Sequence, residues 1–426
     1  MHLASLRLCA TWGMNWDLTL LSKKQQDLRD QRNNRSAAHQ LVTVVIPCYN
    51  QAHFLGEAIE SVLEQTYPHY EIVVVDDGAT DNTSEVASRY PDKVRLIRQE
   101  NRGLSGARNT GIRHSEGEYV VFLDADDRLL PGALQAGLGC FRQQPECAFV
   151  SGHCRFIWAD GSFLMETRPP PIRSDIYLTI LNRSHFIIPG AVMYQRSVFD
   201  TVGWFDPAVN AAADYDLYLR IARAFPVYYH GEVVLEYRRH DTNMTGNPGR
   251  MLKATIDVLR SQREYARRDE LYWEAYKVGV RKGQEEYGLP LAESIQTFTR
   301  KGAWKDAIQD VFLLLRYYPR GIGMLLLNEQ QMERRKLARR LQTRRRELEA
   351  HEQHLKDFEE GIQEKRLESD SLVGERQKVQ QLKERIRRLE RRVRDIDRRT
   401  QNRVHVRVVN YLMRVVGRLR AKLPGR

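Results

Sequence analysis

The sequence predicts an α/β fold with a mostly parallel sheet, followed by C-terminal helices and a coiled coil. Three observations support this prediction. Strand-like apolar runs alternate with helical segments over residues 41–127, the pattern is helical from about residue 250, and heptad spacing follows residue 329. Strands that alternate with helices are typical of a parallel sheet with helices on both faces.

The predicted sheet begins with LVTVVIP, a continuous β-branched run that is typical of a buried strand. Phe54, Ala58 and Val62 then recur at helical spacing. The Asp, Asn and Thr that open DNTSEVASRY can cap the next helix. Further strands are expected in YEIVVVDDG, KVRLIRQ and YVVFLDADD, and a third helix in GLSGARNTGIRHS.

The second half of the chain is predicted to be mostly helical. ESIQTFTRKGAWKDAIQDVFLLLRYYP resembles one helix pair of the tetratricopeptide kind, but no second copy follows, so a repeat array is not expected. Farther on, apolar residues recur at the a and d positions of about seven heptads, with one break in register. A single solvated helix is the alternative for residues 329–371, whereas the paired seam of 372–396 favours self-association. The seam residues are Leu341, Leu348, Leu355, Ile362, Val379, Leu382, Ile386, Leu389, Val393 and Ile396.

These patterns divide the chain into five parts. We expect a poorly ordered extension at 1–40, a sheet domain at 41–250, a helical subdomain at 251–328, a coiled coil at 329–400 and a basic amphipathic helix at 401–426. The last helix can lie in a membrane interface or dock on the rest of the protein, and its hydrophobic pattern alone does not choose between these roles.

The net charge of +12 belongs to the C-terminal part of the 426 residues. Residues 329–426 hold 29 Lys and Arg against 16 Asp and Glu, whereas residues 1–328 have a net charge of −1. Acids interleave with bases in the heptad region, which argues against nucleic-acid binding. No apolar run approaches the ~18 residues that span a bilayer, and five scattered cysteines suit a reducing compartment. We expect a cytoplasmic protein, with peripheral contact at the inner face of the membrane as a further hypothesis.

Polar residues follow the predicted strands at the points where each strand ends. Ligands of parallel sheets gather at the carboxyl ends of the strands, so these residues are expected to meet at one rim. Clustered carboxylates repel one another unless a cation satisfies them. The rim residues are Pro47, Tyr49 and Asn50 after the first strand, Asp76 and Asp77 after the second, and Asp124, Asp126 and Asp127 after the fourth.

Four motifs give this rim a family resemblance. VVIPCYNQAHFLGEAIESVLEQTYPHYEIVVVDDGATDNT, NRGLSGARNTGI, GEYVVFLDADD and VGWFDPAVNAAADYDLYLRIA follow one another over residues 41–245. In this order and spacing they resemble the family 2 glycosyltransferases. The resemblance implies a GT-A fold, a nucleotide-sugar donor, a divalent metal, and inversion at the anomeric carbon. A UDP-sugar is the expected donor, because a carboxylate is a suitable acceptor for the imide N–H of a uracil-type base.

The acids of DADD are expected to hold the metal. Mg²⁺ or Mn²⁺ takes carboxylate and phosphate oxygens together and needs only one or two protein carboxylates. Asp124 and Asp126 supply them, and the resemblance implies that one of these acids, taken as Asp124, also meets the donor ribose. Asp127 is an alternative to Asp126, and a Ca²⁺-binding or helix-capping turn is the alternative to the whole site.

The other donor residues are assigned by resemblance. Asp76 and Asp77 stand where relatives hydrogen-bond the nucleotide base. Tyr49, after Pro47, can lie against the base or plug the sheet edge. Arg108 matches an arginine near the donor phosphates, where a guanidinium fork suits phosphate oxygens; an ordinary solvent-facing helix arginine is its alternative.

Asp214 is the predicted catalytic base, because an inverting transfer needs a carboxylate that takes the proton of the acceptor hydroxyl. The glutamate that usually precedes this aspartate is Ala213 here, which puts the positioning of the acceptor in question. Asp216 would point elsewhere on a helix, and a helix N-terminal acid is the structural alternative for Asp214. His240 stands where relatives hold a histidine near the metal or the diphosphate, although a loop histidine can simply be solvated.

The residues and the resemblance together predict a metal-dependent, inverting glycosyltransferase. The resemblance alone implies a saccharide or lipid-linked saccharide acceptor and a role in bacterial surface polysaccharide or glycoconjugate synthesis. The Gln-x-x-Arg-Trp motif of processive relatives is absent, so one sugar per encounter is expected. A homo-oligomer through the coiled coil is expected as well. The alternative is a GT-A-like scaffold that has lost catalysis and acts through its coiled coil, which only the Ala213 departure supports.

Overall fold

The computed structural model describes residues 40–167, 175–184, 187–209, 211–240, 243 and 246–326, with scattered residues between 337 and 391. Three of the predicted parts, namely the extension at 1–40, the coiled coil at 329–400 and the basic helix at 401–426, lie almost wholly outside these residues. None of the described helices has both the length and the apolar character needed to cross a bilayer.

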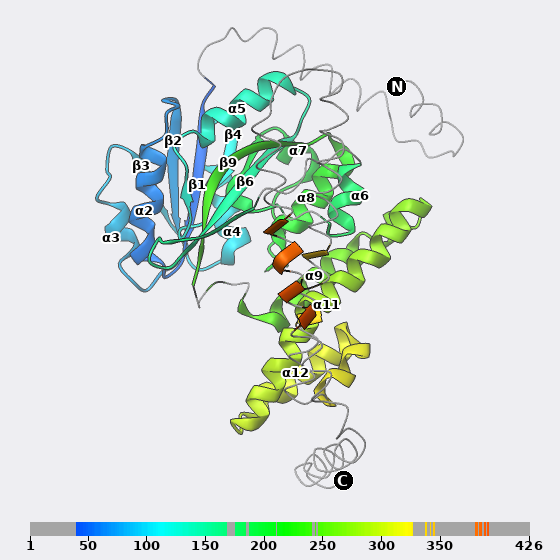
Figure 1. Ribbon diagram of the computed structural model, residues 1–426. Coiled ribbons are helices and arrows are strands. Elements are labelled where there is room, and N and C mark those ends of the chain that lie inside the picture. The colour runs from blue at the N-terminus through cyan, green and yellow to red at the C-terminus, as the bar shows by residue number, and fades with distance from the viewer. Residues whose placement is uncertain are drawn as a thin grey trace.

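A single mixed sheet of nine strands organises the described chain (Figure 1). The strand order is β3-β2-β1-β4-β8-β6-β9-β5, with β7 paired to β6. The first four pair in parallel, as predicted, whereas β8 runs antiparallel to both β4 and β6. The strands are β1 (Val42–Cys48), β2 (Tyr70–Asp76), β3 (Val94–Arg98), β4 (Tyr119–Phe122), β5 (Arg128–Leu129), β6 (Phe149–Trp158), β7 (Phe163–Thr167), β8 (Val192–Gln195) and β9 (Tyr228–Arg239).

Helices cover the sheet and then extend beyond it (Figure 1). Those of the sheet domain are α2 (Ala52–Leu63), α3 (Thr83–Ala87), α4 (Gly103–Arg113), α5 (Ala133–Gln143), α6 (Ile176–Leu181), α7 (Val198–Val202) and α8 (Ala213–Ala224). The C-terminal ones are α9 (Pro248–Ser261), α10 (Arg263–Ala266), α11 (Glu270–Arg300) and α12 (Trp304–Tyr317). Two 3₁₀ segments are η2 (Pro189–Ala191) and η4 (Pro319–Leu326).

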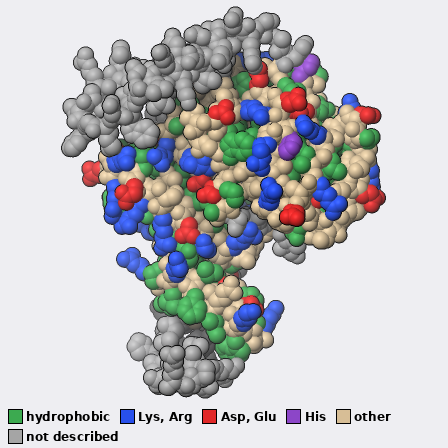
Figure 2. Space-filling model, turned by 180° about the vertical axis from the view of Figure 1, so that it is seen from behind, with side chains coloured by type: hydrophobic (Ala, Val, Ile, Leu, Met, Phe, Trp, Pro, Cys, Tyr) green, Lys and Arg blue, Asp and Glu red, His purple; other side chains and the backbone are tan. Residues whose placement is uncertain are grey.

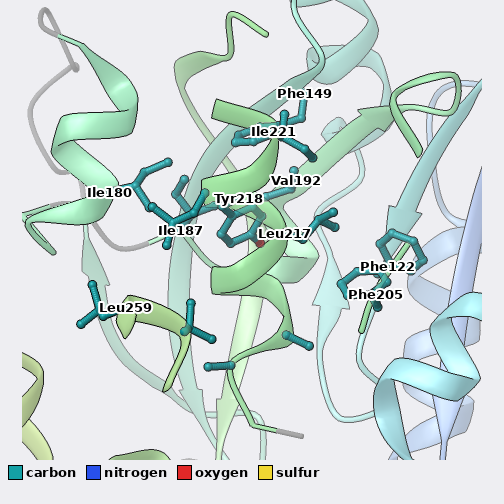
Figure 3. Close-up of a cluster of buried hydrophobic side chains, with 14 of the residues drawn as sticks. Phe122, Phe149, Ile180, Ile187, Val192, Phe205, Leu217, Tyr218, Ile221 and Leu259 are labelled. Carbon is teal, nitrogen blue, oxygen red and sulfur yellow. The ribbon is translucent and has the colours of Figure 1, made fainter. Parts of the chain in front are cut away.

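Strand β1 is buried on both faces, as its continuous β-branched run predicted. Val44 and Ile46 pack into the core shared with α2 and α5, and Val45 into the opposite core, which includes α8. Helix α4 approaches β1 closely because Gly111 has no side chain, and a Cβ there would lie 2.1 Å from Val45. Figure 3 shows how Tyr218 of α8 packs among the side chains of this second core. The backbone that carries the candidate site is therefore fixed by two dry layers.

The C-terminal helices share a core with the sheet. Leu252 of α9 and Leu291 of α11 belong to the same buried cluster as Phe122 of β4. Helix α11 lies against the end of α6, where a Cβ on Gly279 would lie 2.0 Å from the carbonyl oxygen of Leu181. Helices α11 and α12 form the helix pair that the sequence indicated. The domain boundary predicted at residue 250 thus falls inside one continuous core.

Candidate active site

The carboxyl ends of β1 and β2 lie side by side, with Cys48 opposite Asp76. Pro47 of β1 pairs with Val75 of β2. Because Pro47 lies two residues beyond the last pair between β1 and β4, its missing N–H does not interrupt the β1–β4 ladder. Tyr49 follows with 48% of its surface exposed. An exposed ring is available to a ligand, which argues against the alternative role of plugging the sheet edge.

Asp76 and Asp77 are buried, and their carboxylates organise the loops around them. Asp76 accepts hydrogen bonds from the amide of Ala79 and from the hydroxyl of Ser84. Asp77 Oδ1 accepts from Gln99 Nε2 at 2.6 Å and from the Arg102 amide at 2.8 Å. Asp77 thus ties the end of β2 to the start of α4. Beside it is an open cleft that is lined by Gly78, Arg98, Gln99, Glu100 and Asn101.

The turn after β4 orients its acids differently. Asp127 is 2% exposed and accepts a hydrogen bond from the amide of Arg238 at 2.9 Å. Burial, together with Asp126 and Asp124, raises the pKa of Asp127 well above its ordinary value. The Arg238 guanidinium in turn donates to the carbonyl oxygen of Asp126 and to the carboxylate of Glu57. Asp127 is therefore part of the support of the turn, and its carboxylate is engaged with the backbone of Arg238.

Asp126 faces the loop that follows β9. Its Oδ2 lies 2.8 Å from Nε2 of His240 and accepts hydrogen bonds from Gln51 Nε2 at 3.2 Å and Asn243 Nδ2 at 3.3 Å. The His240 ring packs against Phe54, with centroids 5.1 Å apart. The structure thus brings together Asp126 and His240, which are 114 residues apart in the chain. His240 is held in the site, so the alternative of a solvated loop histidine is wrong.

Arg108 forms an ion pair with Asp124 and interacts electrostatically with Asp214. It is 2% exposed, and its NH2 group donates to Asp124 Oδ1 at 2.7 Å. Burial alone would lower the pKa of the guanidinium, but the charges of Asp124 and Asp214 outweigh it and raise that pKa. The Nε of Arg108 has no partner among the described residues. The alternative of a solvent-facing helix arginine is therefore wrong.

Asp214 lies in the first turn of α8, as predicted. Burial raises the pKa of its carboxyl group, whereas Arg108 opposes the rise. Asp216 is committed elsewhere, because it accepts a hydrogen bond from Arg220 Nε at 2.8 Å. Arg220 also donates to the carbonyl oxygens of Val202 and Trp204. Of the two acids, only Asp214 is coupled to Arg108.

The residues fit a metal that is held jointly with a ligand. No group of three or more His, Cys, Asp or Glu side chains in the described part of the chain forms a metal cage. Asp124 Oδ2 and Asp126 Oδ1 accept no hydrogen bond from the described residues, so each has a free coordination position. Mg²⁺ and Mn²⁺ keep several positions for phosphate and water oxygens, which suits two such carboxylates.

Four residues of this site escaped the prediction from sequence. Gln51 and Asn243 donate to Asp126, while Arg238 and Glu57 support the acid turn from behind. Arg238 carries a signal in the sequence, because an arginine in an apolar strand pattern needs buried partners. Gln51, Asn243 and Glu57 carry none, since their spacing resembles that of ordinary surface residues.

Comparison with known proteins identifies the domain. Residues 43–203, which contain all but the first residue of β1, the strands β2 to β8 and the acids of the rim up to Asp127, match the family described as glycosyl transferase family 2. The domain belongs to glycosyltransferase family 2. Together with the observed sheet, this membership confirms the predicted GT-A fold. Asp214 and His240 lie beyond the matched range.

Curated relatives of the family 2 domain carry glycosyltransferase names. Uncharacterized glycosyltransferases of Rickettsia felis and Rickettsia typhi are 32% and 30% identical over 206 and 210 residues, which is 47% and 48% of this chain and 34% and 66% of those proteins. Chondroitin synthase of Escherichia coli is 31% identical over 206 residues, 48% of this chain and 29% of that enzyme. The chain thus spans between about a third and two thirds of the length of these relatives.

Two solved structures align with part of the chain. TarS 1–349 of S. aureus in complex with UDP-GlcNAc aligns with a TM-score of 0.44 and 16% identity, over 66% of this chain and 92% of that one. The mannosyltransferase PcManGT of Pyrobaculum calidifontis, in complex with GDP-Man and Mn²⁺, aligns with a TM-score of 0.43 and 19% identity, over 70% and 95%.

Proposed function

We propose that this chain is a metal-dependent, inverting glycosyltransferase that moves one sugar per encounter from a nucleoside diphosphate donor to an acceptor hydroxyl. The observation that carries the proposal is the position of Arg108, which is hydrogen-bonded to Asp124 and electrostatically coupled to Asp214. One buried cation thus links the acid assigned to the donor with the acid assigned to the acceptor. A scaffold without catalysis would not need that link.

Asp214 acts as the general base. The acceptor hydroxyl gives its proton to the Asp214 carboxylate while its oxygen forms a bond to the anomeric carbon, and the bond from that carbon to the diphosphate oxygen breaks. Because burial raises the pKa of Asp214, the carboxylate is a stronger base than an exposed aspartate. Arg108 opposes this rise in pKa and favours the ionised form of Asp214.

The donor would lie across the ends of β1, β2 and β4. Asp77 Oδ2 accepts no hydrogen bond from the described residues and can receive the imide N–H of a uracil-type base, while the exposed ring of Tyr49 can lie against that base. Asp76, whose oxygens are both engaged, would shape the base pocket from behind. Pro47 fixes the backbone before Tyr49. These contacts favour a UDP-sugar.

Asp124 and Asp126 would hold Mn²⁺ or Mg²⁺ jointly with the donor phosphates, and Asp124 would also meet the donor ribose. His240, whose Nε2 lies 2.8 Å from Asp126 Oδ2, would lie near the metal or the diphosphate. A bound divalent ion supplies Lewis-acid stabilisation of the charge that develops on the leaving diphosphate. Arg108 would support the same phosphates through Asp124 and its own buried guanidinium. The chain's residues therefore bind and orient the donor, and Asp214 moves the proton.

The acceptor class follows from the relatives rather than from the site. One relative of the domain is named chondroitin synthase, which supports a saccharide or lipid-linked saccharide acceptor in bacterial surface polysaccharide or glycoconjugate synthesis. We further propose homo-oligomerisation through residues 329–400 and a cytoplasmic location. Peripheral membrane contact through residues 401–426 is a separate part of the proposal.

A screen of nucleotide sugars by thermal shift, with Mn²⁺ and with chelator, tests the donor assignment. A UDP-sugar should raise the melting temperature in a metal-dependent way, because a ligand that binds only the folded state stabilises it by mass action. Asp124→Ala is the control variant and should lose the shift. If no nucleotide sugar shifts the wild type with metal present, the catalytically lapsed scaffold becomes the better interpretation.

A further inference from the structure

An apolar stripe on α12 has no partner in the described structure. Ile308, Phe312 and Leu315 are 40%, 68% and 46% exposed. Their spacing of four and three residues places them on one side of the helix, whereas Ala307 and Leu314 face the core. Large apolar side chains exposed in a row, unlike scattered single ones, indicate an interaction surface.

The side chains around this stripe are mostly basic. Lys305 and Arg316 are exposed and lie at helical spacing from Ile308 and Phe312, on the same side of α12. Lys301 and Arg320 are exposed at the two ends of the helix. Figure 2 shows hydrophobic side chains at the lower end of the molecule, over the helices that follow the sheet, with Lys and Arg beside them.

We propose that this α12 stripe (Ile308, Phe312 and Leu315 with Lys305 and Arg316) docks the protein on an anionic lipid surface. An amphipathic helix with bulky apolar residues on one side and basic residues beside them suits a membrane interface, where the apolar groups enter the acyl boundary and the cations meet the headgroups. The surface is separate from the rim of Asp124 and Asp214. Its role does not depend on the proposed transfer reaction.

Charge argues against the two other occupants. A second copy docked stripe to stripe would bring Lys305 and Arg316 of both chains together. The chain's own C-terminal segment is also a poor match, because residues 329–426 have a net charge of +13. Like charges placed together weaken such contacts, whereas an anionic lipid surface complements them.

The test is sedimentation of the full chain with phosphatidylcholine vesicles, with and without phosphatidylglycerol. The wild type should bind the anionic vesicles, and the double variant Phe312→Ser, Leu315→Ser should bind them roughly tenfold more weakly, because it removes the inserted apolar groups. Lys305→Glu with Arg316→Glu should cause a loss of similar size on anionic vesicles only.

Leu271→Ser is the matched control, because Leu271 is also 68% exposed but lies in the first turn of α11. It should bind vesicles like the wild type, and all variants should keep the wild-type melting temperature. Unchanged vesicle binding in the double serine variant would overturn the proposal and leave residues 401–426 as the membrane contact. A lower oligomeric mass of that variant in light scattering, with vesicle binding intact, would show instead that the stripe joins copies of the chain.

Discussion

Replacing Arg108 by methionine should destabilise the protein in a pH-dependent way. The change keeps most of the side-chain length but leaves Asp124 and Asp214 without their shared cation. Removing one partner of a buried ion pair costs about 3–5 kcal/mol. The lower end, about 3 kcal/mol, applies here, because the Asp124 side chain keeps 27% exposure and is partly screened by water.

The pH dependence follows from the pKa values of the two acids. Burial raises the pKa of both Asp124 and Asp214 even with Arg108 present, and loss of the cation raises them further. A carboxyl group whose pKa is raised in the folded state contributes stability at low pH and loses it as pH rises through that value. The deficit of Arg108→Met should therefore be small at acidic pH, where both groups are protonated, and largest above neutrality.

Urea unfolding at acidic and alkaline pH measures this effect. At alkaline pH the midpoint should fall by roughly 1 M relative to wild type, for an m-value of about 3 kcal/mol/M. Arg113→Met is the matched control, because Arg113 lies on the same helix but is exposed, with contacts to Thr110 and Trp204. An equal midpoint shift of Arg108→Met at both pH values would refute the coupling of Arg108 to the two acids.

Three other predictions follow from the same structure. Asp126→Asn should abolish metal-dependent donor binding without lowering the melting temperature, since Asp126 lies on the ligand side of the turn. Calorimetric titration with donor and Mn²⁺ checks this prediction, and wild-type binding would show that Asp126 is not a metal ligand. The rate of turnover should rise with pH around a pKa higher than that of an ordinary aspartate, because burial raises the pKa of Asp214 and only the ionised base accepts a proton. A pH–rate profile that is already flat at lower pH would contradict this prediction. Deleting residues 329–426 should leave a monomeric and still active protein, because self-association is expected to depend on the a/d seam of 372–396, which needs a partner helix. A monomeric full-length chain in light scattering would contradict this prediction.

The parallel half of the sheet was predictable from sequence because its central strands β1, β2 and β4 are apolar runs that are buried on both faces, whereas the edge strand β3 is partly exposed. The apolar runs of β1 and β2 leave little choice of secondary structure, and the glycines of α4 fit a helix that packs directly on β1. The later strands were not predictable, because β6, β8 and β9 pair across long sequence separations with mixed direction. Their order depends on tertiary packing rather than on local pattern.

The sequence predicted the site residues that follow the ends of strands. It did not predict the roles that depend on contacts between residues far apart in the chain. Asp124 and Asp126 follow β4 directly, so their shared rim followed from topology. Asp127 supports the turn through its contact with Arg238, which is 111 residues away in the chain. The spacing of residues in the sequence does not predict such a contact. Likewise, the sequence favoured Asp214 over Asp216, but the ion pair of Asp216 with Arg220 and the coupling of Asp214 to Arg108 are evident only in the structure.

The most direct test of the proposed mechanism compares the turnover of Asp214→Asn and Asp216→Asn with a donor identified by the screen. Asp214→Asn should lose about 10²–10⁴-fold in kcat, as expected for removal of a general base, while metal-dependent donor affinity stays at the wild-type value. Asp216→Asn should keep most of its turnover and lose stability instead, because it breaks the pair with Arg220. Wild-type turnover in Asp214→Asn, or an equal loss in Asp216→Asn, would contradict the assignment of Asp214 as the base.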